Sequence, residues 1–481
     1  MTTTHTEYRH DSAHHHEPGR RTMIQRDVVI IGAGVTGLIA ATRLRAAGRT
    51  VAVLEARDRV GGRTWTDQVD GVTLEIGGQW VSPDQTALLE VLDELGLQTH
   101  DRYRDGSSVY VDAEGTRTEY TGDIFPLPTA TANEIERLVD VVDGFVAQVD
   151  PARPWEAPDA RQLDAVTFRD WLHGLSDDRV ATDNVELFIA GAMLTKPAHA
   201  FSALQALLMA ASAGSFANLV DADFILDKRV VGGMQQVSER LAEQLGDDVH
   251  LDAPVRTLRW STTDGEDAVV ALADGGIEVH ARQALVAVPP PLYARISFEP
   301  PLPRRQHQLH QHLSMGFVIK VQAVYDRPFW REAGLSGTAF SPYELVHESY
   351  DNTTHGATQG TLVGFVSDEH ADEVSALPAE ERRARILSSL VHYYGPEAAD
   401  PVVYHESDWG TEEWTRGAYA ASFDLGGLSR YGADQRAAVG PLRFASSDLA
   451  GAGYQHVDGA VRIGREAAAE IATVLPQPVV R

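Results

Sequence analysis

The sequence predicts an α/β fold built as two interleaved domains, and three observations support that prediction. A buried strand, a glycine-rich turn and a helical pattern follow one another near residue 30. Strand patterns return after a long, mainly helical stretch at about residues 100–228, and a final strand end and helix follow residue 440. A chain of 481 residues is also too long for one compact core. We therefore expect one domain to be assembled from separated segments.

The charge balance narrows the classes of partner. Asp and Glu number 69 against 41 Lys and Arg, which gives a formal net charge of −28. Such a surface repels nucleic acids and anionic membranes and attracts cations, although solubility alone is an ordinary reason for an acidic surface. The chain has no run of about 18 apolar residues and no signal-peptide pattern. We expect a cytoplasmic homodimer that binds neither nucleic acid nor membrane.

No metal site is predicted. The chain contains no cysteine, which also excludes disulfides and any thioether link to a cofactor. His14–His16 could bind a metal, but they lie in the segment Met1–Arg26, which has no periodic apolar face and is expected to be a disordered tail. A solvated tail is therefore the favoured interpretation of those histidines.

The first organised segment has the pattern of a Rossmann-like dinucleotide-binding unit. Asp27–Ile31 is predicted as a buried strand, and the turn after it carries three spaced glycines, Gly32, Gly34 and Gly37. They permit a tight turn, a close approach of the backbone to a pyrophosphate, and close packing of the next helix, whose N-terminus faces the phosphate charge. The second strand, Thr50–Leu54, ends at Glu55, where an acidic side chain accepts hydrogen bonds from an adenosine ribose. This context predicts a dinucleotide cofactor, NAD or FAD.

Two stretches after the second strand favour FAD over NAD. Residues 56–64 (Ala-Arg-Asp-Arg-Val-Gly-Gly-Arg-Thr) resemble the extended dinucleotide motif of the glutathione-reductase-type flavoproteins, and in particular that of the flavin-containing monoamine oxidase family. Residues 75–80 (Glu-Ile-Gly-Gly-Gln-Trp) match the segment that runs beside the isoalloxazine ring in that family. The resemblance implies that Arg63 meets the pyrophosphate, while Gly61 and Gly62 let the chain pass beside it. The cofactor that it implies is FAD.

The family resemblance extends over nearly the whole chain beyond residue 26. Residues 77–86, 194–206 and 412–419 are most similar to the bacterial putrescine oxidases, a branch of the family. The similarity implies oxidation of a small aliphatic amine, with putrescine foremost, to 4-aminobutanal (which cyclises to 1-pyrroline), ammonia and hydrogen peroxide, with dioxygen as acceptor. An oxidase for aromatic or other monoamines is the first alternative. A flavin-binding protein without turnover is the second.

The expected domain boundaries follow the strand patterns. The FAD-binding domain is predicted from residues 27–100, 229–302 and 412–475, and the α+β substrate-binding domain from residues 101–228 and 303–411. Within them, strands are predicted at 250–260, 268–272, 277–280, 284–289, 318–325 and 361–366, and helices at 230–245, 378–394 and 458–471. No internal repeat or low-complexity linker interrupts this order.

Three residues are expected to act at the reacting amine. Lys320 ends the apolar run Phe317-Val-Ile-Lys, an unusual place for an ammonium. In similar oxidases this lysine holds a water beside flavin N5, whereas a lysine reaching for the surface is the ordinary alternative. Tyr419 matches one wall of the family's aromatic cage, which aligns a neutral amine nitrogen as hydride leaves the adjacent carbon. The other wall, usually a tyrosine, corresponds to His456. An imidazole can still form a wall, but it can also be charged near neutral pH, and that charge would repel an ammonium substrate.

The remaining cofactor contacts are assigned by resemblance. Ala418 stands where mitochondrial monoamine oxidases carry the cysteine bonded to flavin, so FAD is expected to be held without a covalent bond. Val255 is expected against the adenine, and the helix that begins at Asp458 is expected to face the pyrophosphate. The full set of expected cofactor contacts is Gly32, Gly34, Gly37, Glu55, Ala56, Arg57, Gly62, Arg63, Gly78, Gln79, Trp80, Val255, Trp409, Ala418, Ser447, Asp448, Asp458, Gly459 and Ala460.

A diamine carries a second ammonium, which an apolar pocket would reject unless it met a carboxylate. By resemblance, Glu348 is expected to bind that second ammonium. Glu344 and Asp351 are its rivals, and an exposed loop carboxylate without such a role is an alternative of equal weight. An amino-acid oxidase would instead need an arginine aimed at the substrate carboxylate, and the sequence assigns no arginine to that role.

Overall fold

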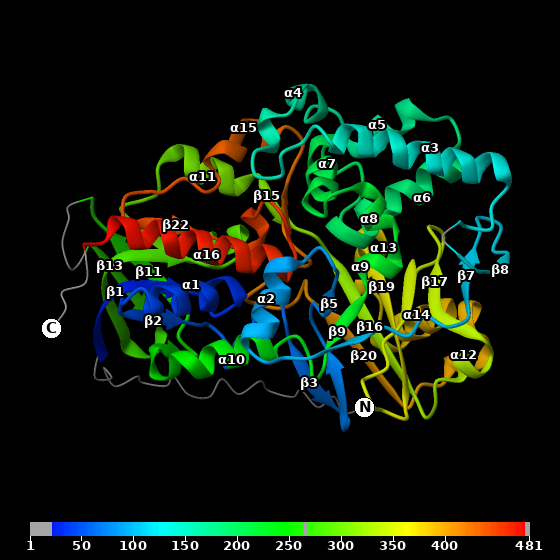
Figure 1. The fold of residues 1–481 in the computed structure, drawn as a ribbon, viewed down its shortest axis with the longest axis horizontal. Coiled ribbons are helices and arrows are strands. Elements are labelled where there is room, and N and C mark those ends of the chain that lie inside the picture. Colours follow the sequence, from blue (N-terminus) through cyan, green and yellow to red (C-terminus); the bar gives the residue numbers. More distant parts are fainter. Residues whose placement is uncertain (1–21, 123, 263–267, 477–481) are drawn as a thin grey trace, which may run out of the picture.

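The computed structural model describes residues 22–122, 124–262 and 268–476. The histidines His14–His16 and the rest of residues 1–21 lie outside the described residues. Two sheets lie side by side along the long axis, and a layer of helices covers one edge of the second sheet (Figure 1). The predicted fold class, a Rossmann-like sheet joined to an α+β part, is confirmed.

The first sheet has the strand order β10-β2-β1-β13-β12-β11-β14, with β22 beside the end of β13. Strands β1, β2, β10, β13 and β22 are parallel, as in a nucleotide-binding sheet, and helices α1, α10 and α16 cover it. The bounds are β1 (Thr22–Ile31), β2 (Val51–Leu54), β10 (Val249–His250), β11 (Val255–Trp260), β12 (Val269–Ala273), β13 (Ile277–Val286), β14 (Ser297–Glu299), β22 (Leu442–Phe444), α1 (Val35–Ala46), α10 (Gln236–Leu245) and α16 (Val457–Val474).

Three boundaries in this sheet differ from the sequence prediction. Strand β1 begins five residues before Asp27, because residues 22–26 pair with residues 277–281 of β13. Those five residues of the predicted disordered tail are therefore strand. The predicted strand 250–260 is two strands, β10 and β11, because Asp252 adopts a φ of 52° and Pro254 has no N–H to donate. The strands predicted at 277–280 and 284–289 form one strand, β13.

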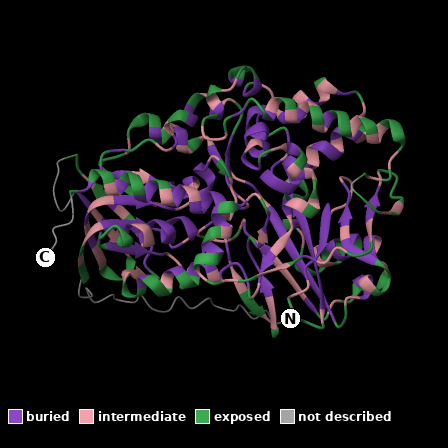
Figure 2. Ribbon diagram, viewed as in Figure 1, coloured by how far each residue is buried: buried purple, intermediate pink, exposed green. Residues whose placement is uncertain are grey.

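The second sheet has the order β20-β16-β19-β18-β17-β7-β8 and is antiparallel except between β17 and β7. Every residue of β16 and β19 is buried (Figure 2), because one face packs on α14 and the other packs on residues around β4, which include Leu74 and Ile76. The bounds are β7 (Ser107–Val111), β8 (Arg117–Tyr120), β16 (Val318–Tyr325), β17 (Leu335–Phe340), β18 (Glu348–Asp351), β19 (Gly360–Ser367), β20 (Val403–Asp408), α12 (Phe329–Glu332), α13 (Asp368–Ser375) and α14 (Ala379–Tyr394).

The stretch predicted as mainly helical, residues 100–228, begins with strands β7 and β8, which join the second sheet. The helices after them bury a separate apolar cluster, which includes Phe168, Phe201 and Phe216. These helices are α3 (Thr129–Val146), α4 (Ala160–Leu163), α5 (Phe168–Leu175), α6 (Arg179–Ile189), α7 (Ala203–Ser212), α8 (Phe216–Val220) and α9 (Ala222–Ile225).

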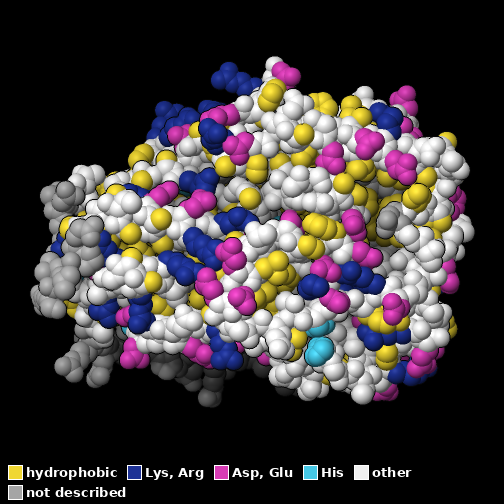
Figure 3. All heavy atoms as spheres, viewed as in Figure 1, with side chains coloured by type: hydrophobic (Ala, Val, Ile, Leu, Met, Phe, Trp, Pro, Cys, Tyr) yellow, Lys and Arg dark blue, Asp and Glu magenta, His cyan; other side chains and the backbone are white. Residues whose placement is uncertain are grey.

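Short elements connect these parts. They are β3 (Thr66–Val69), β4 (Val72–Glu75), β5 (Trp80–Val81), α2 (Thr86–Glu94), β6 (Thr99–Asp101), β9 (Lys228–Val230), α11 (Arg304–Gln311), β15 (Leu313–Met315), β21 (Ala421–Phe423) and α15 (Gly427–Tyr431). On the face drawn in Figure 3, acidic and basic side chains are interspersed. Within the described ranges, no helix has the length and apolar character needed to cross a membrane.

Helix α11 contains a histidine whose burial makes stability depend on pH. His310 packs against the rings of Tyr293 and Phe444, at centroid distances of 4.7 and 5.9 Å. Burial, and to a lesser extent the charge of His307, lowers the pKa of His310 from 6.5 to about 4. Between these values the unfolded chain binds a proton that the native state does not, so stability falls as pH falls through this window.

Lowering the pH from about 7 to about 5 should reduce the free energy of unfolding of both the wild type and His310→Gln. We expect the reduction in His310→Gln to be about 1 to 2 kcal/mol smaller than in the wild type. Urea unfolding at both pH values measures this difference. The exposed His355 supplies the control His355→Gln, which should keep the wild-type pH dependence. An unchanged dependence in His310→Gln would show that this ring is not the source.

Candidate active site

A cavity of about 850 Å³ lies at the carboxyl ends of β1 and β2 and extends between the two sheets. Ligands of open α/β sheets bind at this edge. The expected cofactor residues that line the cavity are Gly32, Gly34, Glu55, Ala56, Arg57, Gly62, Arg63, Gly78, Gln79, Trp80, Val255, Trp409, Ala418, Ser447 and Ala460. The residues expected at the amine, Lys320, Glu348, Tyr419 and His456, line the same cavity.

Four expected cofactor residues, Gly37, Asp448, Asp458 and Gly459, lie behind the cavity wall. A Cβ at Gly37 would come within 2.0 Å of the carbonyl oxygen of Gly32, so this glycine permits close helix–strand packing. Asp448 accepts two hydrogen bonds from Arg63, at 2.9 and 2.6 Å. Asp458 accepts one from the backbone N–H of residue 88, and a Cβ at Gly459 would meet the backbone of residue 453. These residues hold the wall in place, and their contact with a cofactor stays a prediction.

The nucleotide end of the cavity has the groups that a dinucleotide needs. Glu55 is 4% exposed, and its two oxygens accept hydrogen bonds from the backbone N–H groups of Ala33 and Arg57, at 2.7 and 3.0 Å. A Cβ at Gly34 would meet no heavy atom within 4 Å, so the backbone there faces open space. The hydroxyl of Ser446, which also lines the cavity, is buried and has no partner within the described structure. Bare backbone and an unused hydroxyl at this edge fit a bound flavin dinucleotide.

Lys320 lies on β16 in the cavity wall and is 4% exposed. Its Nζ donates to the carbonyl oxygens of Glu75 and Gly77, at 2.5 and 2.9 Å, and to Oε1 of Gln79 at 2.7 Å. Burial lowers the pKa of Lys320, which the charge of Glu75 opposes, and burial raises the pKa of Glu75. The alternative of a lysine reaching for the surface is wrong. All three N–H groups of a charged Lys320 have acceptors, so a water held beside it would require one of these bonds to give way.

Tyr419 and His456 are half-buried and line the cavity, as the walls of a cage would. Burial, followed by the charge of Glu348, raises the pKa of Tyr419 well above its usual range, and its ring meets the ring of Phe365 edge-on. Burial lowers the pKa of His456, so the neutral imidazole is favoured near neutral pH and does not repel a cation. Nδ1 of His456 lies 3.0 Å from the carbonyl oxygen of Tyr454. A carbonyl only accepts, so Nδ1 carries the hydrogen and the lone pair is on Nε2.

Glu348 is buried on strand β18, so the alternative of an exposed loop carboxylate is wrong. The residue is 6% exposed, and it lines the cavity. Both rivals are engaged elsewhere. Glu344 accepts one hydrogen bond from the hydroxyl of Ser389, and its other oxygen lies 2.7 Å from Nδ1 of His392. Asp351 accepts two hydrogen bonds from Arg331. Neither rival lines the cavity.

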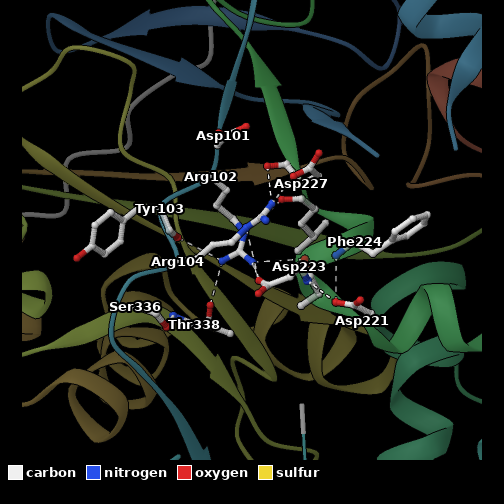
Figure 4. A network of polar contacts seen from close by, with 12 residues as sticks. Asp101, Arg102, Tyr103, Arg104, Asp221, Asp223, Phe224, Asp227, Ser336 and Thr338 are labelled. Carbon is white, nitrogen blue, oxygen red and sulfur yellow. Dashed lines mark hydrogen bonds and ion pairs between the residues drawn. The ribbon is translucent and has the colours of Figure 1, made fainter. Parts of the chain in front are cut away.

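Sequence reasoning missed Tyr350, which contacts Glu348, and Arg102, which packs on Tyr350. Tyr350, two residues along β18, donates a hydrogen bond to Glu348 and lines the cavity. Arg102 lies over the Tyr350 ring, and its guanidinium group donates to Asp223 and Thr338 (Figure 4). The two-residue spacing of a strand could have indicated Tyr350. Nothing local predicts Arg102, because its partners are more than 100 residues away in sequence.

Comparison with known proteins decides the family. The family model described as flavin containing amine oxidoreductase matches residues 35–472. The chain belongs to this family. Putrescine oxidase of Kocuria rosea is 64% identical to this amine oxidoreductase over 94% of the chain and 96% of that protein. Flavin-containing amine oxidase B of Canis lupus familiaris is 32% identical, over 92% of the chain and 86% of that protein.

Solved structures agree with the sequence comparison. Wild-type putrescine oxidase bound to putrescine superimposes with a TM-score of 0.92 at 65% identity, covering 94% of this amine oxidoreductase and 100% of that chain. Cyclohexylamine oxidase from Brevibacterium oxydans IH-35A gives a TM-score of 0.87 at 32% identity, covering 93% and 99%. The family predicted from residues 56–64 and 75–80 is confirmed, and the family implies a flavin in the cavity.

Proposed function

We propose that this amine oxidoreductase oxidises putrescine with FAD held without a covalent bond. The observation that carries the proposal is the burial of Glu348 in the same cavity as Lys320 and Tyr419. A buried carboxylate is costly unless a cation pairs with it, and the second ammonium of a diamine supplies that cation. The similarity to proteins named putrescine oxidase supports the same substrate.

The chain's own residues would hold both ends of the diamine. Glu348 would bind the far ammonium, while Tyr419 and the neutral His456 would flank the reacting nitrogen. A bound flavin would supply the acceptor for hydride from the carbon next to that nitrogen and the route by which the electrons reach dioxygen. Overall, putrescine, dioxygen and water give 4-aminobutanal, which cyclises to 1-pyrroline with loss of water, together with ammonia and hydrogen peroxide. No general base is needed if the neutral amine is the form that binds.

The residues that line the cavity would contact successive parts of FAD. The pyrophosphate would lie against the backbone at Gly34 and the N-terminus of α1, with Arg63 beside it. Glu55 would accept hydrogen bonds from the ribose, and Val255 would pack on the adenine. The remaining lining residues named above would surround the flavin end. The anchoring would then consist of hydrogen bonds and buried area alone, because Ala418 offers no thiol.

Denaturation is expected to release all of the flavin from the purified protein. Neither Ala418 nor any other residue can form a thioether, since the chain contains no cysteine. Acid precipitation followed by absorbance of the supernatant and the pellet measures the partition. Yellow colour that stays with the washed pellet would contradict non-covalent binding.

Product analysis tests the proposed reaction. Putrescine, butylamine and tyramine are incubated separately with the holoenzyme in air, and 1-pyrroline, aldehyde and hydrogen peroxide are measured. We expect putrescine to be the best substrate and to give 1-pyrroline and peroxide in equal amounts. Faster turnover of tyramine would support the aromatic monoamine alternative, and no turnover of any amine would support a flavin-binding protein without catalysis.

The proposal also covers the partners, location and assembly of the enzyme. A net charge of −28 attracts a cationic substrate and disfavours nucleic-acid and anionic-membrane partners. A homodimer that acts in the cytoplasm stays a prediction from the sequence. Size-exclusion chromatography with light scattering measures the assembly.

A further inference from the structure

We propose that Tyr350 positions the carboxylate of Glu348 so that one oxygen stays available for the far ammonium of a diamine. The inference rests on the proposed function. Glu348 and Tyr350 are two residues apart on β18, so their side chains point to the same face of the sheet. Both residues line the cavity. The hydroxyl of Tyr350 donates to Oε2 of Glu348 at 2.9 Å. A hydroxyl fixed in this way holds the carboxylate in one orientation.

The hydroxyl of Tyr350 can only act as a donor toward Glu348. Burial, followed by the charge of Glu348, raises the pKa of Tyr350 well above its usual range. The phenol therefore stays protonated at any pH at which the enzyme works, and it gives the carboxylate a charge-assisted hydrogen bond. Without that bond, the carboxylate would be buried with one fewer donor and would be free to turn about its side-chain torsions.

The ring of Tyr350 is held from two directions. Trp80 meets it edge-on at a centroid distance of 6.3 Å, and the guanidinium carbon of Arg102 lies 5.4 Å from the ring centroid. The Arg102 side chain is 1% exposed, and it donates to Asp223 at 2.6 Å and to Thr338 at 3.0 Å (Figure 4). Figure 4 shows that these partners approach Arg102 from different segments of the chain. The position of the Tyr350 hydroxyl is thus set before substrate arrives.

The second oxygen of Glu348, Oε1, is left for the substrate. The ring nitrogen Nε2 of His347 lies 3.7 Å from it, beyond hydrogen-bond distance. No hydrogen bond to Oε1 from another residue of the described chain is found. An ionised carboxylate accepts several hydrogen bonds, so an ammonium can bind at Oε1 while Tyr350 stays bonded to Oε2. Tyr350 would then act through Glu348 and is a positioning residue.

The test compares Tyr350→Phe, Glu348→Gln, the double variant and the wild type, with putrescine and butylamine as substrates. Because a hydrogen bond to a charged group is lost, we expect Tyr350→Phe to raise KM for putrescine about tenfold with kcat nearly unchanged. Kinetics with butylamine should stay within about twofold of wild type, since a monoamine has no second ammonium. The double variant should lose no more putrescine activity than Glu348→Gln alone, because both changes remove one interaction.

Tyr343→Phe is the matched control. It deletes a hydroxyl that donates to the carboxylate of Asp183 at 3.2 Å, and neither residue lines the cavity. Its kinetics should match the wild type, and the flavin absorbance and melting temperature of Tyr350→Phe should stay near wild-type values because the ring is retained. Equal losses with both amines, or additive losses in the double variant, would overturn the positioning role. A wild type that does not prefer putrescine to butylamine would overturn the proposed function instead.

Discussion

Replacing Lys320 with methionine is expected to slow the reoxidation of the reduced enzyme by dioxygen about 100-fold, while reduction by putrescine changes far less. Dioxygen gains negative charge as it takes up electrons, and a buried ammonium nearby stabilises that charge much more than it would in water. Burial lowers the pKa of Lys320, but the three acceptors around Nζ, from Glu75, Gly77 and Gln79, oppose that effect and favour the charged form that this role requires. Stopped-flow mixing of the reduced enzyme with oxygenated buffer measures the rate.

Lys196 supplies the control for that experiment. It is a second buried lysine, which donates to Ser314 and to the carbonyl oxygen of Ser422 but does not line the cavity. Burial lowers its pKa to about 8. Lys196→Met should therefore reoxidise at the wild-type rate. If both variants reoxidised equally slowly, the effect would come from loss of a buried lysine in general, and the assignment of Lys320 to the oxygen reaction would be wrong.

Replacing Glu348 with glutamine is expected to lower kcat/KM for putrescine about 100-fold and to leave butylamine within about threefold. The amide keeps the shape of the side chain and one hydrogen-bond acceptor, but it removes the charge that meets the far ammonium. Steady-state peroxide production with both amines gives the ratio. Most of the loss should be in KM, since the far ammonium is bound in both the ground state and the transition state.

Glu344→Gln tests the same charge change at the rival position. Glu344 bonds to Ser389 and His392 outside the cavity, so putrescine kinetics should not change. Equal losses of putrescine and butylamine in Glu348→Gln would show that the carboxylate does not recognise the second ammonium. A loss for putrescine in Glu344→Gln that matched the loss in Glu348→Gln would move that role to the rival.

The sequence predicted best what is local. The end of the strand before Gly32, the turn and helix α1 have strong local sequence patterns, and the structure has them where the glycine spacing placed them. Helix 378–394 was predicted within one residue for the same reason. By contrast, strands β7 and β8 were missed, because each is short and gains its stability by pairing with a sheet whose other strands lie more than 200 residues later.

The site was also predicted only in part. The contacts that were missed depend on residues that are far apart in the sequence. Resemblance placed Lys320, Glu348, Tyr419 and His456 together, and they do line one cavity. It did not reveal that Nζ of Lys320 uses all its hydrogens on acceptors of the segment 75–79. It also did not reveal the contact between the Tyr350 ring and Arg102, because tertiary packing brings these distant segments together.

The central claim, that this family member oxidises a diamine, is tested most directly by anaerobic bleaching of the yellow holoenzyme. Putrescine, butylamine, tyramine and an amino acid are mixed with it in parallel without dioxygen, and the flavin absorbance is followed. We predict rapid bleaching by putrescine, slower bleaching by butylamine, and little change with tyramine or the amino acid. Bleaching by tyramine or the amino acid faster than by putrescine, or no bleaching by any of the four, would contradict the account.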